Sequence, residues 1–345
     1  MRPEVDVLVV GGGPIGLATA IEARLAGLTA MVLEARRGTV DKACGEGLMP
    51  GAVQALARLD VHPPGQPFHG IAYVQGARRA EHRFAGRPGL GVRRTVLHAT
   101  LALRAAQLGI EVRHVRVTDL AQDAQGVRVA GVEARWLLAC DGLHSRVRQL
   151  TGLALTSPRT AARARRRFGL RRHYVVAPWS DLVEVHWARD VEAYVTPVAP
   201  DLVGVAVLGP PGLDHHDAVA AVPALRERLA GAPVHGTLRG AGPLLQRTVR
   251  RSAGRVRLVG DASGYVDALT GEGVRVGLAQ ARAAVATLDA GNDAYEAAWS
   301  AATRDYRVLT TGLLAAARSP LRGAIVPAAV ALPRVFGGVV DRLAR

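Results

Sequence analysis

The sequence Gly11-Gly12-Gly13-Pro14-Ile15-Gly16 decides the fold at the start of the chain. It follows a β-branched run from Val5 to Val10, which is typical of a buried strand, and it opens a predicted helix that ends near Ala26. In such a strand–turn–helix unit, Gly11 permits the tight turn, Gly13 lets a pyrophosphate approach the backbone, and Gly16 lets the helix pack on the strand. The helix N-terminus then presents free amides and a positive dipole end to the phosphates.

A second predicted strand, Ala30 to Leu33, leads to Glu34, which stands 18 residues after Gly16. A carboxylate at this place can accept hydrogen bonds from ribose hydroxyls. The pattern therefore predicts a dinucleotide site, and it does not distinguish NAD from FAD. The residues that we expect to contact the dinucleotide here are Gly11, Gly13, Pro14, Gly16, Glu34, Ala35 and Arg36.

The composition excludes several classes of protein. The 345 residues carry 44 Lys and Arg against 29 Asp and Glu, a net charge of +15, yet Lys42 is the only lysine. An arginine- and alanine-rich chain of this kind fits the codon usage of a GC-rich genome. Aromatic residues make up only 4% and no basic run alternates with them, so we expect no nucleic-acid binding. The densest basic cluster is predicted to be a solvated linker between domains, and it comprises Arg163, Arg165, Arg166, Arg167, Arg171 and Arg172.

The cysteines and the N-terminus indicate where the protein resides. Cys44 and Cys140 have neither the spacing of a metal site nor the number for a disulfide framework, which suits a reducing cytosol. Met1 to Glu4 leads directly into the first strand, so no signal peptide is expected. We therefore expect a cytoplasmic protein without a bound metal.

Strand and helix patterns along the chain indicate a discontinuous domain. After a helix from Thr95 to Leu108, a β-meander is expected over residues 111–139, and four strands of an antiparallel sheet over residues 172–208. A helix is predicted for Ala218 to Ala230, a returning strand for Val256 to Val259, and a long helix for Gly273 to Leu288.

These patterns predict an α/β fold with a Rossmann-like cofactor domain, an inserted, mainly antiparallel sheet domain that binds substrate, and C-terminal helices. The cofactor domain comprises residues 1–67, 91–165 and 249–290, the sheet domain residues 68–90 and 166–248, and the C-terminal helical segment residues 291–345.

The apolar C-terminal stretch from Val308 to Val340 leaves two interpretations open. Its longest charge-free part, Gly323 to Pro333, is too short to span a bilayer. It predicts either helices that pack on the core or a surface for peripheral contact with a membrane or a partner.

Two further motifs each follow an apolar strand. Asp141-Gly142 begins a DGxxSxxR pattern that ends at Arg148, directly after the strand Trp136 to Ala139. Gly260-Asp261 follows the strand that begins at Val256. Each pair alone is a common turn, but their order and their strand contexts agree with the opening glycine motif.

With these three motifs the chain resembles the large flavoprotein family of para-hydroxybenzoate-hydroxylase-like monooxygenases, geranylgeranyl reductases and flavin-dependent halogenases, over roughly residues 5–290. The resemblance implies FAD as the cofactor. It implies that Gly260 and Asp261 hold a ribityl or ribose hydroxyl, and that Asp141, Gly142 and Arg148 help to order the pyrophosphate and to engage NAD(P)H. Arg94, in Arg94-Thr95-Val96-Leu97, resembles the start of the family's cofactor-side helix.

The resemblance also assigns residues near the flavin. The segment from Asp267 opens the long helix, and its free amides would favour negative charge at the flavin edge. Ala268 stands where the family usually has proline. Cys44-Gly45 resembles a cysteine–glycine segment near the flavin of the reductases. The flavin contacts expected from these segments are Cys44, Gly45, Gly271, Glu272, Gly273 and Val274.

Three functions remain open at this point. The first is an FAD-dependent monooxygenase that uses NAD(P)H, as a transient co-substrate, and O2 on an apolar aromatic or polyketide-like small molecule. The second is an FAD-dependent ene reductase of an isoprenoid or lipid. The third is a flavin-binding scaffold without redox turnover. Candidate catalytic residues are Cys44 for proton transfer and His186 and Tyr194 for help in deprotonating a phenol. Tyr194 stands where the geranylgeranyl reductases carry a tryptophan, and this difference argues against the second function, ene reduction.

Overall fold

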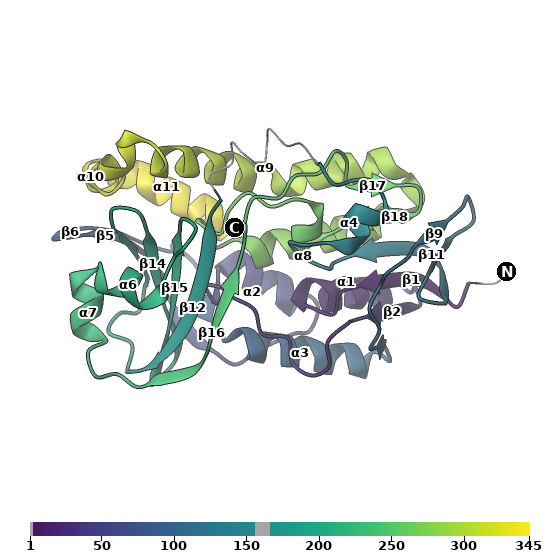
Figure 1. Cartoon of the computed structure of the whole chain (residues 1–345), viewed down its shortest axis with the longest axis horizontal. Coiled ribbons are helices and arrows are strands. Elements are labelled where there is room, and N and C mark those ends of the chain that lie inside the picture. Colours follow the sequence, from purple (N-terminus) through teal and green to yellow (C-terminus); the bar gives the residue numbers. More distant parts are fainter. Residues whose placement is uncertain (1–2, 156–165) are drawn as a thin grey trace.

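The computed structural model describes residues 3–155 and 166–345. The fold is α/β, as predicted, with two large sheets and one small sheet among the described residues (Figure 1). The strands of the first sheet are β1 (Val5–Val10), β2 (Ala30–Leu33), β8 (Glu111–Arg113), β9 (Ala121–Gln122), β10 (Val127–Val129), β11 (Val132–Ala139), β17 (Ser252–Ala253) and β18 (Val256–Leu258).

The centre of the first sheet is parallel and buried on both faces. β1 pairs in parallel with β2 and with β11, and β18 pairs in parallel with β11. The expected β-meander is wrong in one respect, because β8 joins the far side of β2 in parallel. Within residues 111–139, antiparallel pairs join β9, β10 and the start of β11. At the other edge of the sheet, β17 also pairs antiparallel with β18. A local alternation pattern predicts a strand, but it does not reveal which neighbour the strand will find.

Helices cover this sheet because its β-branched strands present apolar side chains on both faces. The helices of the cofactor region are α1 (Pro14–Leu25), α2 (Pro50–Ala57), α3 (Arg94–Gln107), α4 (Arg146–Leu150) and α8 (Gly273–Ala286). Buried residues of α1, α3 and α8 share one apolar core with Val7, Val9 and Val32 of the sheet. Short 3-10 helices lie at η1 (Gly260–Ser263) and η2 (Leu288–Ala290).

The second sheet is mainly antiparallel, as expected. Its order is β16-β12-β15-β14-β13-β5-β6, and only the β13–β5 pair is parallel. Its strands are β5 (Gly70–Gln75), β6 (Arg78–Arg83), β12 (Phe168–Val175), β13 (Val183–Trp187), β14 (Glu192–Ala199), β15 (Leu202–Gly209) and β16 (Val234–Ala241). Because residues 70–83 and 168–241 build one sheet, we propose the division into domains given above.

Two elements of the region that contains the second sheet differ from the sequence prediction. The single helix expected over 218–230 is two short helices, α6 (His215–Ala220) and α7 (Pro223–Arg228), because Pro223 lacks an N–H and begins a helix of its own. β16 was not predicted, since it is an exposed edge strand without apolar alternation. A third, small sheet joins β3 (Gly47–Leu48), β4 (Gln66–Phe68) and β7 (Gly89–Gly91).

The basic cluster is not the solvated face that we expected. Arg167 and Arg171 are buried, and each pairs with carboxylates. Arg166 is exposed and Arg172 is partly buried, whereas Arg163 and Arg165 lie outside the described residues. The carboxylates that pair with these arginines lie in distant segments, so the sequence of the arginine cluster alone does not reveal that its members are buried.

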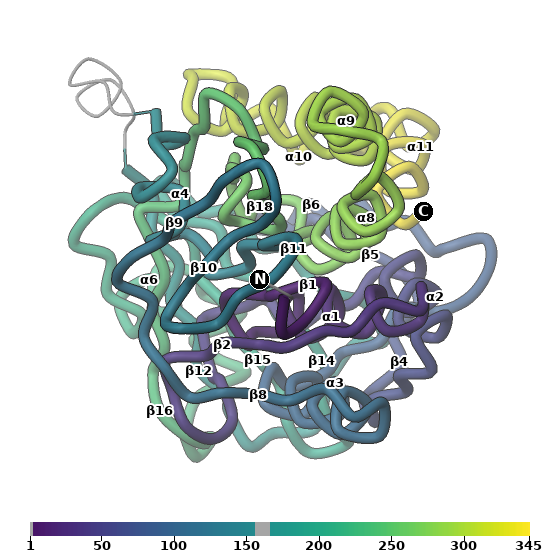
Figure 2. Tube along the Cα trace, turned by 90° about the vertical axis from the view of Figure 1, so that its right-hand side faces the viewer, coloured from purple at the N-terminus to yellow at the C-terminus, as the bar shows by residue number. Residues whose placement is uncertain are grey.

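The C-terminal segment forms α9 (Asn292–Ala317), η3 (Pro320–Ala324), α10 (Ile325–Ala331) and α11 (Pro333–Ala344). Figure 1 shows α9 running along the molecule, and Figure 2 shows it stacked beside α8. The chain bends by 101° between α9 and residues Pro320–Ala331, and α10 and α11 then pack on β6. Among the described helices, none is by itself both long enough and apolar enough to cross a bilayer.

Candidate functional site

A cavity of about 910 Å3 lies between the two large sheets. Backbone of the glycine turn and of the motifs after β11 and β18 forms one side of it. The other side consists of apolar and aromatic side chains of the second sheet and of α11. These are Ile71, Tyr73, Val183, Val185, Tyr194, Ala206, Leu208, Val340 and Leu343.

The glycine turn has the close contacts that its sequence requires. Gly11 has φ +102°, and a Cβ there would lie 2.5 Å from the Cys140 carbonyl oxygen. A Cβ on Gly16 would lie 1.7 Å from the Gly11 carbonyl oxygen. Gly16 therefore packs the helix and does not line the cavity. Gly13 and Pro14 do line it, and the nearest atom to a Cβ on Gly13 is Arg94 Nη2 at 4.0 Å.

Glu34 directly follows β2 and is an ionised acceptor beside the turn. Its Oε2 accepts from the Gly12 amide at 2.7 Å and its Oε1 from the Arg36 amide at 2.9 Å. Burial raises the pKa of Glu34, but these amides and the Arg36 guanidinium outweigh it, and the pKa lies below its usual value. Glu34, Ala35 and Arg36 all line the cavity.

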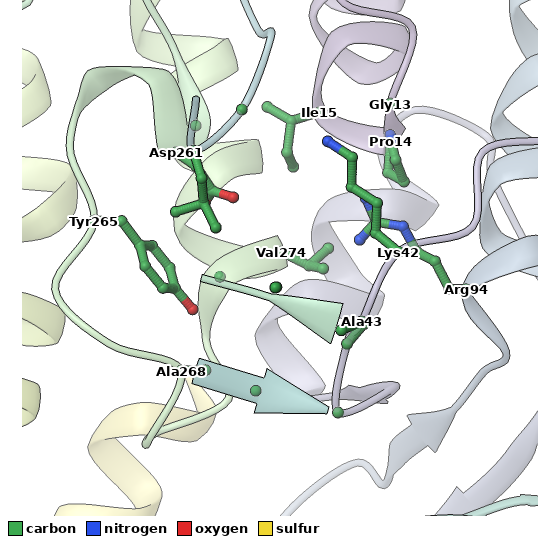
Figure 3. A pocket seen from close by; sticks show the side chains of 18 of the residues that line it. Gly13, Pro14, Ile15, Lys42, Ala43, Arg94, Asp261, Tyr265, Ala268 and Val274 are labelled. Carbon is green, nitrogen blue, oxygen red and sulfur yellow. The ribbon is translucent and has the colours of Figure 1, made fainter. Parts of the chain in front are cut away.

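Charged groups of both signs face each other across the cavity (Figure 3). Lys42 and Arg94 lie near Gly13 and Pro14, and Asp261 lies on the opposite wall. Burial, together with Arg36 and Arg94, lowers the pKa of Lys42. Burial raises the pKa of Asp261, although Lys42, Arg94 and Arg148 oppose this. Lys42 was not predicted as a site residue, and its uniqueness in the chain was the only available signal.

Unpartnered buried polar atoms show that this wall fits a phosphate and ribityl group. Arg94 Nε has no hydrogen-bond partner among the described residues, and neither has Asp141 Oδ1. The other oxygen of Asp141 accepts from the Val147 amide at 3.1 Å and so holds the start of α4. A cation with a free donor and a carboxylate with a free acceptor suit phosphate and hydroxyl groups respectively.

Arg148 is placed differently from the prediction. It does not line the cavity, and its guanidinium donates to the carbonyl oxygens of Ala262 at 3.0 Å and Leu143 at 2.7 Å. It therefore fixes the two motifs that carry Asp141 and Asp261 to each other. Gly142, Gly260 and Asp261 line the cavity.

The loop before α8 is held by a buried charge network. Arg167 donates to Asp267 at 3.0 Å and to Glu192 at 2.6 Å, and Glu192 also pairs with Arg322 at 2.5 Å. Asp267 Oδ1 accepts from the Leu269 amide at 3.1 Å. This fixes the backbone from which Gly271, Gly273 and Val274 line the cavity. Glu272 does not line it, because its buried side chain pairs with Arg275.

Two of the three candidate catalytic residues line the cavity, and the third does not. Cys44 lines the cavity with Gly45, and its sulfur accepts from the Glu46 amide at 3.4 Å. Tyr194 also lines it, and its hydroxyl donates to the Leu269 carbonyl at 2.8 Å. His186 does not line it. It pairs with Glu184 at 3.1 Å and lies across from Ala193, which packs with the core under α6 and α7. Alternation along a strand fixes two faces, but the sequence does not tell which one meets the cavity.

A second buried network holds the loop that carries Lys42 and Cys44. Glu46 is 3% exposed, has φ +60°, and its Oε2 lies 2.6 Å from His173 Nε2 on β12. Its Oε1 accepts from the Arg94 amide at 2.8 Å. Arg171 pairs with Asp41 at 2.5 Å. The second sheet thus positions the loop that carries Lys42 and Cys44.

Comparisons with known proteins agree with this geometry. Residues 4–170 match the model of the FAD binding domain family. Over 166 residues the chain is 33% identical to rifampicin monooxygenase of Streptomyces venezuelae, a match that covers 43% of this chain and 34% of that protein. It is 29% identical to digeranylgeranylglycerophospholipid reductase 1 of Methanopyrus kandleri, over 80% of this chain and 78% of that protein.

Among solved structures, a flavoprotein/dehydrogenase from Cytophaga hutchinsonii superposes with a TM-score of 0.85 at 19% identity, over 99% of this chain and 92% of that one. The chain spans about a third of the length of the monooxygenase that it matches. The match over residues 4–170 and the polar wall of the cavity lead to one conclusion: the protein is a flavoprotein whose residues 4–170 are similar to the FAD binding domain family.

Proposed function

We propose that the protein is an FAD-dependent monooxygenase that uses NAD(P)H and O2 on an apolar aromatic or polyketide-like small molecule. The observation that supports this most is the apolar half of the cavity, which is continuous with the FAD wall. Bound FAD supplies electron transfer from NAD(P)H and the reaction with O2. The protein then has to bind the substrate, orient it and exclude water.

The apolar walls serve these three tasks. Val185, Ala206 and Leu208 of the sheet and Val340 and Leu343 of α11 present no polar atom to a substrate. They favour an apolar ring over water, because burying such surface is worth about 25 cal/mol per Å2. The chamber therefore selects substrates by shape and apolar area.

Tyr194 has a positioning role in this proposal, not the role of a base. Burial and the neighbouring Glu192 raise its pKa well above the ordinary value. The phenol stays protonated at neutral pH, and its bond to the Leu269 carbonyl holds the loop that leads into α8. The free amides at the start of α8 would favour negative charge on the flavin edge.

A specific observation favours ene reduction as the second candidate. Cys44 lines the cavity, and the Glu46 amide donates to its sulfur. In an ene reduction, the bound cofactor would supply a hydride to one carbon of a double bond and the protein would supply a proton to the other. Cys44 would donate that proton. The similarity to the archaeal reductase extends over 78% of its length.

Anaerobic and aerobic turnover separates the candidates. FAD-loaded protein would be mixed with NADH or NADPH, using 1-naphthol and geranylgeraniol as probes. A product that gains one oxygen atom only when O2 is present supports the monooxygenase. A product that gains two hydrogens without O2, and that is lost in Cys44→Ser, supports the reductase. If neither NADH nor NADPH bleaches the flavin in the presence of either probe, the remaining interpretation is a flavin-binding scaffold without redox turnover.

A further inference from the structure

Helix α11 forms a wall between the apolar cavity and the outer surface. On its inner side Val340 and Leu343 line the cavity, and Phe336 packs on Tyr73 with ring centroids 5.0 Å apart. On its outer side Val335 is 61% exposed and Val339 is 36% exposed. The helix therefore presents apolar side chains both to the cavity and to its exposed side.

The C-terminal helices carry further exposed apolar side chains, and we call this set together with those of α11 the C-terminal face. It consists of Val308, Leu321, Val330, Leu332, Val335 and Val339. The described residues include fourteen exposed large apolar side chains. Six of these fourteen lie within the short stretch between residues 308 and 339. Such a concentration on one side of a protein marks a site of interaction.

Most charged residues of the C-terminal segment are positive. Residues 300–345 contain seven arginines and two acids. Both acids are paired, Asp305 with Arg342 at 2.9 Å and Asp341 with His82 at 2.8 Å. Arg304, Arg307 and Arg334 are exposed. The same helices thus offer exposed aliphatic side chains and exposed cations, which complements an anionic surface with an apolar interior.

We propose that the C-terminal face docks on an anionic phospholipid bilayer. Its valines and leucines enter the interface, and the arginines meet the lipid phosphates. Docking places α11 against the lipid, so an apolar substrate reaches the chamber past this one helix. That last consequence rests on the proposed function, whereas the docking itself does not.

The test is sedimentation of the FAD-loaded protein with vesicles, read by flavin absorbance. One set of vesicles contains equal parts of phosphatidylcholine and phosphatidylglycerol, and the other phosphatidylcholine alone. We expect the protein to sediment with the anionic vesicles, and to do so less at high salt because screening weakens the arginine contacts. Protein that stays in the supernatant with the anionic vesicles overturns the proposal, whatever the turnover assays show.

Paired variants locate the surface. Val335→Asn with Val339→Asn should lower partitioning to anionic vesicles by about tenfold, since two apolar side chains no longer enter the interface. Leu103→Asn with Val249→Asn, two residues exposed to similar extents elsewhere, should leave it unchanged. Retained flavin absorbance shows that each variant is folded. Equal losses in both pairs contradict the assignment. So does a wild-type dimer that ignores vesicles and dissociates in the first pair, because a second copy then covers the face.

Discussion

The two sides of the cavity are built in different ways. On the FAD side, three short segments, 11–16, 140–142 and 259–261, follow the adjacent parallel strands β1, β11 and β18 at their carboxyl ends, where such sheets bind ligands. On the chamber side, single side chains arrive from β5, β13, β14, β15 and α11. The residues of the cofactor site lie in short contiguous sequence motifs, because the edge of the sheet brings the ends of the strands together. A chamber for substrate has no such contiguous pattern.

The strongest test of this difference is Gly16→Ala. Its Cβ would lie 1.7 Å from the Gly11 carbonyl oxygen, so the turn must move. We expect FAD binding to weaken by about 3 kcal/mol or more, roughly a hundredfold in Kd. Titration of the apoprotein with FAD measures it. Gly312→Ala, where a Cβ meets nothing within 4 Å, is the control, and equal affinity in both variants would contradict the account.

Glu46→Ala tests the link between the two sides. The change leaves His173 and Arg171 buried without this carboxylate. We expect the free energy of unfolding to fall by about 3 kcal/mol in urea denaturation. Arg83→Ala, which breaks the exposed pair with Asp181, should cause no measurable loss. A similar loss in both variants would mean that the buried network has no special role.

Asp261→Asn separates cofactor binding from stability. We expect FAD affinity to fall by about 2 kcal/mol, because an ionised acceptor is lost. The apoprotein should become more stable at neutral pH, because burial raises the pKa of Asp261 and ionising it in the folded state is unfavourable.

The direction of the pKa shift of Asp261 predicts how the stability gain of this variant depends on pH. The stability gain should be absent below the ordinary pKa of 3.8, grow as the pH rises toward the raised pKa, and stay constant above it. Thermal unfolding across this range, without FAD, measures the gain. A gain that increases toward acid pH would contradict the assignment.

Lys42→Ala should have a smaller effect on FAD. The ammonium lies in the cavity near Gly13 and Arg94, and we expect its removal to weaken FAD by about 1 kcal/mol. The dependence of Kd on salt should also become shallower, since one cation fewer meets the pyrophosphate. Arg37→Ala, an exposed cation that does not line the cavity, is the control. An unchanged salt slope in Lys42→Ala would place the lysine away from the phosphates.

Ala206→Leu should change FAD binding least and still affect turnover. The added side chain enters the chamber beside Tyr194, because Ala206 lines the cavity on β15 and pairs with Tyr194 of β14. We expect the Kd of FAD to stay within about twofold, while NAD(P)H oxidation coupled to a bulky substrate falls. A large loss of FAD would show that the two sides are not separable.

The sequence predicts the FAD side well because each of its motifs is local. The turn at Gly11 to Gly16, Asp141-Gly142 and Gly260-Asp261 each follow a strand that the composition already indicates. Arg148 is an instructive exception, since it lies within a motif and yet holds Leu143 and Ala262. A motif records that a residue is needed in a site, but it does not say whether the residue contacts the ligand or another part of the protein.

The chamber side is less predictable because its contacts join distant segments. His186 was expected in the site and faces the core near Ala193 instead. The face of β13 that meets the cavity depends on how the second sheet sits on the first, which no local pattern contains. Lys42 was missed for the same reason, since only the folded loop brings it near Gly13.

The network around Arg167 has a consequence for the order in which the protein matures. The loop that carries Gly271 depends on Asp267, Arg167 and Glu192, and Glu192 needs Arg322 as its second partner. During synthesis the glycine turn emerges before residue 322, but this set of charges is complete only after residue 322 has left the ribosome. The nascent chain can therefore form its dinucleotide fold before the flavin-side loop is completed.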